Sequence, residues 1–255
     1  MSVLETYQLS VNTFDSKEVA SKKAAARIAE LIQDRDSKGE NTILGLATGS
    51  SPLGVYAELI RLHKEEGLSF QNVITFNLDE YLPMDANSAH SYVYFMQENL
   101  FKHIDIKPEN IHIPDGTLSQ EQVDSFCQEY EQKIAAVGGI DIQLLGIGRT
   151  GHIGFNEPPS SLDSLTRQVI LHEITRIDAA PGFGGIEHVP SSAITMGVGT
   201  IMKAKEVIML AWGESKAAIV KEMIQGEISE QVPATFLQYH ANTQVYLDKT
   251  AASAL

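Results

Sequence analysis

The sequence of 255 residues contains a single cysteine, Cys127, so the chain can form no internal disulfide and no cysteine-based metal cluster. Residues 125–130 are typical of a helix, and we interpret Cys127 as a buried or half-buried structural thiol rather than a nucleophile. His63, His103 and His112 have no carboxylate or cysteine at metal-ligand spacing. We therefore expect no metal site.

Positive charge is also scarce. The chain has 19 Lys and Arg against 33 Asp and Glu, which gives a formal net charge of -14, and it has no run of basic residues. The average field of such a chain repels a nucleic-acid backbone, so we expect no nucleic-acid partner. If the protein binds an anionic phosphate, backbone N–H groups and individual Lys or Arg residues must concentrate positive potential in one place.

Long apolar runs are absent as well. No stretch approaches the roughly 18 apolar residues that a membrane-spanning helix requires. Residues 1–8 lack both the basic and the apolar segment of a signal peptide. We expect no membrane partner and a cytoplasmic location.

Short apolar runs alternate with amphipathic helical runs along the chain. We expect strands at 42–47, 72–77, 141–146, 205–211 and 244–247, and helices at 16–37, 52–66, 88–101, 119–136 and 214–225. This order predicts a single α/β domain over residues 1–255, an open, mostly parallel, twisted sheet with helices on both faces, in the three-layer manner of a Rossmann fold. Such sheets bind ligands beyond the carboxyl ends of their strands.

The least regular segment is 157–191, which is rich in Pro, Gly and Ser. A long irregular segment in a compact domain is often a lid or a binding loop, and we interpret residues 157–191 as such a segment.

Residues 46–52, with the sequence Leu-Ala-Thr-Gly-Ser-Ser-Pro, join a strand to a helix. The turn presents backbone N–H groups and three hydroxyls at a helix N-terminus, which favours an anion. An ordinary helix-capping turn explains the same residues, and no Gly-Lys-Ser/Thr follows as in a P-loop.

Asp79 and Glu80 follow the next strand directly. Either carboxylate could remove a proton next to a carbonyl, and the alternative is a helix cap or a solvated loop.

Residues 146–158 place His152 in a glycine-rich turn after a third strand, with Glu157 five residues later. A carboxylate near an imidazole orients the ring and raises its basicity. The glycine spacing resembles a dinucleotide fingerprint, but no helical pattern follows it, so we reject dinucleotide binding.

Lys216 lies in the first turn of a helix after a fourth strand. A cation there opposes the helix dipole, which suits a residue that faces a phosphate, although a solvated lysine is the alternative.

The chain resembles the glucosamine-6-phosphate deaminase/isomerase family along nearly its whole length, as a variant subgroup. The matching stretches are LATGSSPLG at 46–54, VITFNLDEY at 73–81, GRTGHIGFNEP at 148–158 and TMGVGT at 195–200. The related 6-phosphogluconolactonases share the fold and a similar Gly-His turn but lack the Phe-Asn-Glu-Pro continuation.

This resemblance implies the deamination of glucosamine 6-phosphate to fructose 6-phosphate and ammonia in amino-sugar catabolism. His152 would carry the proton for ring opening with Glu157 as its partner, and Asp79 would move the proton from C2 to C1. The resemblance implies no metal and no redox cofactor. It assigns the phosphate to Thr48, Gly49, Ser50, Ser51 and Lys216.

Two positions depart from the family pattern. Thr150 stands where well-known members have an acidic residue two positions before the histidine. Members also have a phosphate-binding Arg in the segment aligned with 178–185, where this chain has none. Our hypothesis is that Arg176 or Arg149 supplies that charge.

Some relatives have a second phosphate site between subunits. Ser160, Ser161 and Arg167 match part of it, but Val169 stands at the position of its Lys, so we predict no regulation by an amino sugar. Relatives range from monomers to hexamers, and a homo-oligomer stays an open alternative here.

Three other functions remain open. They are a galactosamine-6-phosphate deaminase, a 6-phosphogluconolactonase-like hydrolase in which His152 activates water and Asp79 has no role, and a non-catalytic sugar-phosphate sensor.

Overall fold

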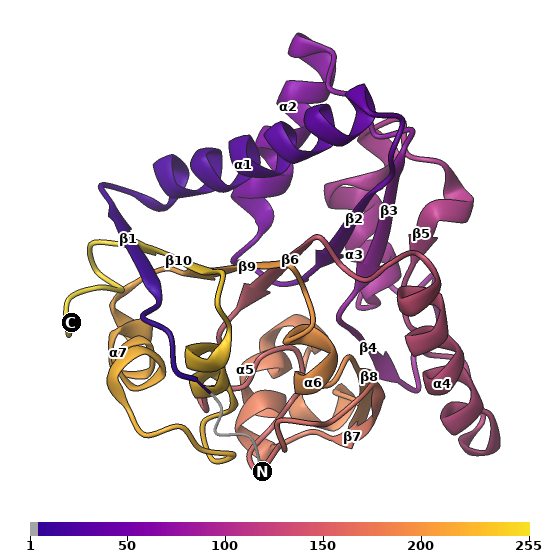
Figure 1. Cartoon of the computed structure of the whole chain (residues 1–255). Coiled ribbons are helices and arrows are strands. Elements are labelled where there is room, and N and C mark those ends of the chain that lie inside the picture. Colours follow the sequence, from indigo (N-terminus) through magenta and orange to yellow (C-terminus); the bar gives the residue numbers. More distant parts are fainter. Residues whose placement is uncertain (1–4) are drawn as a thin grey trace.

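The computed structural model describes residues 5–255 and is built around a seven-stranded sheet whose paired strands all run parallel (Figure 1). From edge to edge the strands are β1 (Ser10–Phe14), β10 (Thr243–Asp248), β9 (Glu206–Ala211), β6 (Ile142–Gly146), β2 (Thr42–Leu46), β3 (Val73–Asn77) and β5 (Ile111–His112). The predicted open parallel sheet is confirmed. β10, which contains the strand expected at 244–247, is not the edge of the sheet, because β1 pairs with its outer side.

Helices cover both faces of this sheet, as predicted. One layer contains α1 (Lys17–Ser37), α2 (Leu53–Glu66) and α3 (Tyr92–Asn99), and the other contains α4 (Gln120–Ala136), α6 (Val198–Ile201) and α7 (Ala217–Gln225). In Figure 1, α1 and α2 lie together above the sheet and α7 lies below it.

The layers follow from the alternation of side chains along buried strands. In β2, Ile43 belongs to the core under α4 and α7, whereas its neighbour Leu44 packs in the core under α1 and α2. Because both faces are covered, all five β2 residues are buried, and the strand is a continuous apolar run instead of an alternating one.

A second, three-stranded sheet was not predicted. It joins β4 (Asp79–Leu82), β8 (Ser192–Thr195) and β7 (Arg167–Ile170) in antiparallel pairs. Strands of four residues are too short to show a period in the sequence. This sheet matters for the site, because Asp79 is the first residue of β4 and pairs with Thr195.

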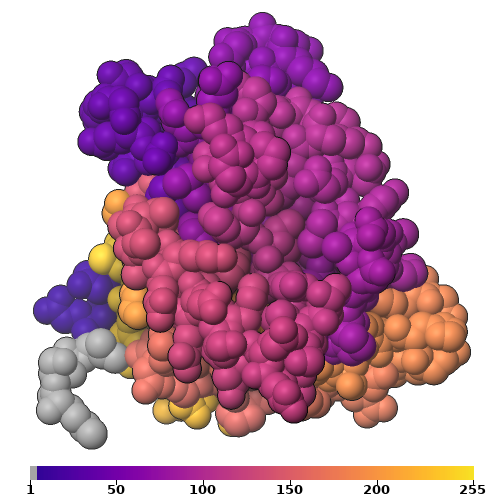
Figure 2. All heavy atoms as spheres, turned by 90° about the vertical axis from the view of Figure 1, so that its right-hand side faces the viewer, coloured from indigo at the N-terminus to yellow at the C-terminus, as the bar shows by residue number. Residues whose placement is uncertain are grey.

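The interpretation of 157–191 as irregular is wrong in part, because the segment contains β7, the helix α5 (Glu173–Phe183) and the 3-10 turn η3 (Ile186–His188). The His172 side chain caps α5 by accepting from the backbone N–H of Ile174. Pro181 and Gly182 hide the helix in the sequence, because both residues disfavour helix interiors. In Figure 2 the region that includes α5 protrudes at the lower right, in orange.

Other element ends agree with the predictions or differ by a few residues. Ser16, the first residue of the range expected for this helix, caps α1 by accepting from the N–H of Val19. The helix expected from residue 88 begins at Tyr92, where Ser91 is the cap. Cys127 is free and buried, and burial raises the pKa of its thiol to about 11, which fits a structural thiol. Within residues 5–255 no helix is both long and apolar enough to span a bilayer.

Candidate active site

A cavity of about 220 Å³ lies at the carboxyl end of the parallel sheet. The chain runs outward from β2 to β3 and β5 on one side, and through β6, β9 and β10 on the other. The loops that follow β2 and β6 therefore leave in opposite directions, and the crevice between them is where parallel sheets bind ligands. The cavity is lined by Ala47, Thr48, Gly49, Ser50, Ser51, Leu78, Asp79, Tyr92, Gly146, Ile147, Gly148, His152, Gly154, Phe155 and Lys216.

The turn before α2 forms one wall of the cavity. Two side chains fix its backbone from outside, since the Tyr56 hydroxyl donates to the Ala47 carbonyl at 2.5 Å and the Trp212 indole N–H donates to the Ser51 carbonyl at 2.9 Å. Gly49 has φ +87°, in the left-handed region that a side chain disfavours. The turn thus presents N–H groups and hydroxyls at the positive end of a 14-residue helix, which suits an anion.

Lys216 lies opposite this turn, at the residue that precedes α7. Its Nζ donates to the Ile147 carbonyl at 2.8 Å. Burial lowers the pKa of Lys216, while Asp178 raises it and Arg149 lowers it. An ammonium group that is partly desolvated gains more from an anionic ligand than one in open water does.

Asp79 and Glu80 are adjacent but have different surroundings. Asp79 lines the cavity with 6% of its surface exposed, and burial, assisted by Glu80, raises its pKa to about 8. The Glu80 carboxylate instead accepts the backbone N–H groups of Tyr92 and Val93 at 2.8 and 3.1 Å. Glu80 therefore caps α3, and Asp79 is the carboxylate that faces the cavity.

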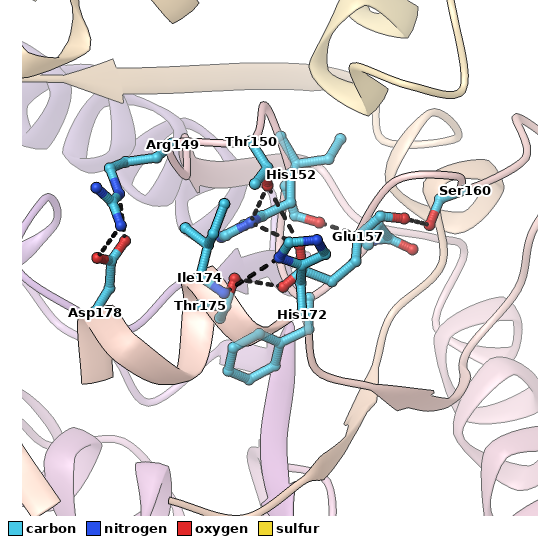
Figure 3. A network of polar contacts seen from close by, with 12 residues as sticks. Arg149, Thr150, His152, Glu157, Ser160, His172, Ile174, Thr175 and Asp178 are labelled. Carbon is cyan, nitrogen blue, oxygen red and sulfur yellow. Dashed lines mark hydrogen bonds and ion pairs between the residues drawn. The ribbon is translucent and has the colours of Figure 1, made fainter. Parts of the chain in front are cut away.

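His152 and Glu157 are held in one polar network (Figure 3). The imidazole Nδ1 lies 3.2 Å from Glu157 Oε2 and 2.9 Å from the Thr150 hydroxyl, which itself lies 3.3 Å from Oε2. An ionised carboxylate only accepts hydrogen bonds, so the proton belongs on Nδ1 and the lone pair of Nε2 is free for a ligand. A Cβ atom on Gly148 would lie 2.1 Å from the imidazole, so the ring needs glycine there.

Glu157 is 8% exposed and has donors on both of its oxygens. Burial alone would raise its pKa, but the contacts with His152 and the hydroxyls of Thr175 and Thr150 outweigh burial and lower it. The Thr175 hydroxyl, on α5, donates to Oε1 at 2.5 Å. The network thus maintains an ionised carboxylate beside the imidazole.

The two candidate arginines occupy different places. Arg176 Nη2 donates to the carbonyls of Ile186 and Val189 at 3.0 and 3.1 Å, and no group within residues 5–255 accepts a hydrogen bond from its buried Nε. Arg176 therefore holds the turn after α5, and the structure does not bring it to the cavity. Arg149 is half exposed, follows the cavity residue Gly148, and pairs with Asp178 at 2.7 Å.

Three side chains of this region were not predicted from the sequence. Phe155 lies within a stretch quoted for its family resemblance, but nothing in its pattern marked it as a cavity residue. Tyr92 and Thr175 lie on helices, and no local signal in the sequence relates them to strand ends elsewhere in the chain.

The fold and the cavity define a class of α/β enzyme in which one cavity is lined by a turn at a helix N-terminus, a lysine, a buried carboxylate and the imidazole of an imidazole–carboxylate pair. Comparison with known proteins gives the family within that class. The chain belongs to the glucosamine-6-phosphate isomerases/6-phosphogluconolactonase family, whose model matches residues 15–246.

Its relatives include the glucosamine-6-phosphate deaminase of Thermoanaerobacter pseudethanolicus, which is 48% identical over 238 residues, 93% of this chain and 92% of the relative. A putative glucosamine-6-phosphate deaminase-like protein of Bacteroides thetaiotaomicron is 47% identical over 97% of this chain, and the chain spans 37% of that relative's length. Among solved structures, a monomeric glucosamine-6-phosphate deaminase has a TM-score of 0.92 at 43% identity and covers 97% of this chain with its whole length. The 6-phosphogluconolactonase of Trypanosoma brucei, with a TM-score of 0.80 at 21% identity, shares the fold.

Proposed function

We propose that this protein is a glucosamine-6-phosphate deaminase, which converts glucosamine 6-phosphate and water into fructose 6-phosphate and ammonia in amino-sugar catabolism. The observation that carries the proposal is that one cavity contains Asp79, His152, Lys216 and the turn 48–51. A phosphate at one end and proton-transfer groups at the other match a phosphorylated sugar that must open and isomerise. The relatives named above support the choice of amino sugar.

The phosphate binds in this proposal to the turn formed by Thr48, Gly49, Ser50 and Ser51 and to Lys216. Of the two arginines that the sequence offers as an additional cation, we infer that Arg149 has this role. Its charge acts on Lys216, whereas the Arg176 guanidinium is bound to backbone carbonyls. Asp178 neutralises Arg149 while no phosphate is bound.

Ring opening needs a group that takes the proton of the C1 hydroxyl and returns one to the ring oxygen. His152 is suited to both steps, because Nε2 is free and Nδ1–H is directed at acceptors. The imidazolium that forms in between is stabilised by the ionised Glu157. The Thr150 hydroxyl accepts from Nδ1 and donates to Oε2, and so connects the pair where other members have a second carboxylate.

Isomerisation of the open chain is the work of Asp79. Its carboxylate removes the proton from C2, the C1 carbonyl oxygen takes a proton from the C2 ammonium and becomes an enol hydroxyl, and Asp79 then delivers its proton to C1. The nitrogen that remains on C2 is then an imine, to which water adds before ammonia leaves. A carboxylate whose pKa is about 8 is a stronger base than an exposed one.

A hexosamine 6-phosphate carries a charged phosphate and does not cross a bilayer unaided. We therefore propose that the protein works where the phosphorylated sugar is formed, in the cytoplasm.

If the protein were instead a sugar-lactone phosphate hydrolase, the buried Asp79 carboxyl would have no role in catalysis. The test replaces Asp79 with Asn and measures ammonia release from glucosamine 6-phosphate and hydrolysis of 6-phosphogluconolactone, with galactosamine 6-phosphate in parallel. Asp124→Asn is the matched control, because Asp124 is exposed on α4. We expect ammonia release to fall by roughly 10²-fold or more in Asp79→Asn only, since general-base catalysis contributes about that much. Lactone hydrolysis that both variants retain, without ammonia release by the wild type, would contradict the proposal.

A further inference from the structure

The two oxygens of the Glu157 carboxylate face different parts of the molecule. Oε2 contacts His152 and Thr150, which belong to the loop after β6. Oε1 accepts from Thr175, which is 8% exposed and lies in the first turn of α5. Among residues 5–255, Thr175 is the one protein donor that reaches Oε1. A buried carboxylate oxygen without a donor is costly, so this single bond has a large influence on how the carboxylate is oriented.

A second contact joins the side of α5 that carries Thr175 to the loop after β6. Asp178 follows Thr175 by three residues, so the two side chains project from one side of the helix. Its carboxylate makes a bidentate pair with Arg149, at 2.8 Å from Nε to Oδ2 and 2.7 Å from Nη2 to Oδ1. Figure 3 shows this pair beside the His152–Glu157 network. Bidentate pairs fix orientation as well as distance, so two contacts, Thr175–Glu157 and Asp178–Arg149, hold α5 against the loop after β6.

We infer that Thr175 is a positioning residue for the reaction. Its hydrogen bond to Glu157 links the packing of α5 against the loop after β6 to the orientation of the Glu157 carboxylate toward His152. The inference rests on the proposed function, in which His152 carries the proton for ring opening. Thr175 itself does not line the cavity. Its effect passes through Glu157 to the imidazole.

Removing the Thr175 hydroxyl has a defined electrostatic consequence. Valine keeps the branched shape but leaves Oε1 without a donor, and the carboxylate becomes more basic. A more basic Glu157 carboxylate interacts more strongly with Nδ1–H and so stabilises the imidazolium form of His152. A higher pH is then needed before Nε2 loses its proton and can act as a base. The part of the low-pH limb that reports loss of the Nε2 proton therefore moves to higher pH, while the part that reports ionisation of Asp79 stays where it is.

Other charged groups surround this pair, and none of them changes in the substitution. Asp79 faces the cavity from β4, Lys216 from the start of α7 and Arg149 from the loop itself, while Asp178 projects from α5. A shift that appears on replacing Thr175 can then be assigned to its hydroxyl.

The experiment compares Thr175→Val, Thr175→Ser and the control Thr166→Val. Thr166 is 6% exposed and its hydroxyl donates to Glu131 Oε1 at 2.6 Å, so it is the same substitution at a threonine–carboxylate bond outside the cavity. The Thr166 N–H and the Thr200 hydroxyl still donate to this oxygen in the control. Two quantities are measured for each protein: kcat and KM for glucosamine 6-phosphate across pH, and the titration of the His152 ring by NMR.

For Thr175→Val we expect kcat to fall roughly tenfold with little change in KM. We also expect the part of the low-pH limb that reports the Nε2 proton to move upward by roughly 1 pH unit, because loss of a charge-assisted bond is equivalent to about one pKa unit. The His152 titration should shift in the same direction. Thr175→Ser should restore both, and Thr166→Val should leave both unchanged.

A Thr175→Val protein that is folded, with wild-type pH profile and wild-type His152 titration, would overturn the inference. The same holds if Thr166→Val shifts the profile equally, because the effect would then be a general loss of packing. Failure of the proposed function has a different signature: the wild type would release no ammonia, while the NMR titration of the same variants would still decide the role of Thr175.

Discussion

Replacing Asp79 with Asn is expected to stabilise the folded protein while it lowers ammonia release by roughly 10²-fold or more. Asp79 is buried, and its pKa is raised from 3.8 to about 8, so the folded state binds its proton more tightly than the unfolded chain does. Between these two values the unfolded carboxyl ionises freely and the folded one does not. The Asp79 carboxyl therefore reduces the free energy of unfolding increasingly as pH rises from about 4 to about 8. Asparagine cannot ionise and is free of this cost.

The size of the gain follows from the pKa difference. Each unit corresponds to about 1.4 kcal/mol, so the ceiling is about 6 kcal/mol above pH 8 and about 2 kcal/mol at pH 5. For a chain of this length each kcal/mol moves the melting temperature by roughly 2–4 °C, so the difference between the two pH values is easily resolved.

Urea or thermal unfolding of the wild type, Asp79→Asn and the exposed-site control Asp124→Asn, each at pH 5 and pH 8.5, measures this effect. The gain in Asp79→Asn should be larger at pH 8.5, and the control should show no comparable trend. A gain that is equal at both pH values, or a loss of stability at pH 8.5, would refute the argument that Asp79 is a desolvated carboxyl.

Three further predictions concern the cavity. Lys216→Met should raise KM for the sugar phosphate roughly 10–100-fold with a smaller effect on kcat, because it removes a charge-assisted bond that is made equally in ground and transition states, and steady-state kinetics will show the split. Gly148→Ala should cost most of the activity while the protein stays folded, since its Cβ would lie 2.1 Å from the His152 ring; circular dichroism and the activity assay decide this together. Arg176→Ala should leave KM nearly unchanged but lower the melting temperature, because Arg176 donates to two backbone carbonyls after α5. Arg149→Ala should raise KM. The reverse result would indicate that Arg176, not Arg149, binds the phosphate.

Residues that follow a strand directly could be placed from the sequence. The turn 48–51, Asp79 and His152 come directly or within a few residues after apolar runs, and parallel strands bring all their carboxyl ends to one edge of the sheet. The order of strands was not needed for this conclusion. The same logic could not choose between Asp79 and Glu80, because that choice depends on α3, whose N–H groups bind Glu80.

The residues contributed by α5 could not be placed in this way. Pro181 and Gly182 obscured the helix, so the faces on which Thr175 and Arg176 lie were unknown, and Arg176 and Arg149 remained equal candidates for the phosphate. The direction of a helical side chain is set by the helix itself and by what the helix packs against. Both are tertiary information.

Thr150 illustrates how a departure from a family pattern acquires a physical explanation. An imidazole without a carboxylate at this position loses one partner that would raise its basicity. In the structure the Thr150 hydroxyl lies between Nδ1 and Glu157, and Glu157 gains a further donor in Thr175. One ionised carboxylate with two hydroxyl partners can orient the imidazole without a second negative charge.

The most direct test of the proposed reaction is to incubate the purified wild-type protein with glucosamine 6-phosphate and to assay ammonia and fructose 6-phosphate in the same samples over time. The account predicts that the two products appear in equal amounts and that the rate rises with pH as Asp79 ionises toward about pH 8. Fructose 6-phosphate without ammonia, or no product from a folded protein that still binds the sugar phosphate, would contradict it.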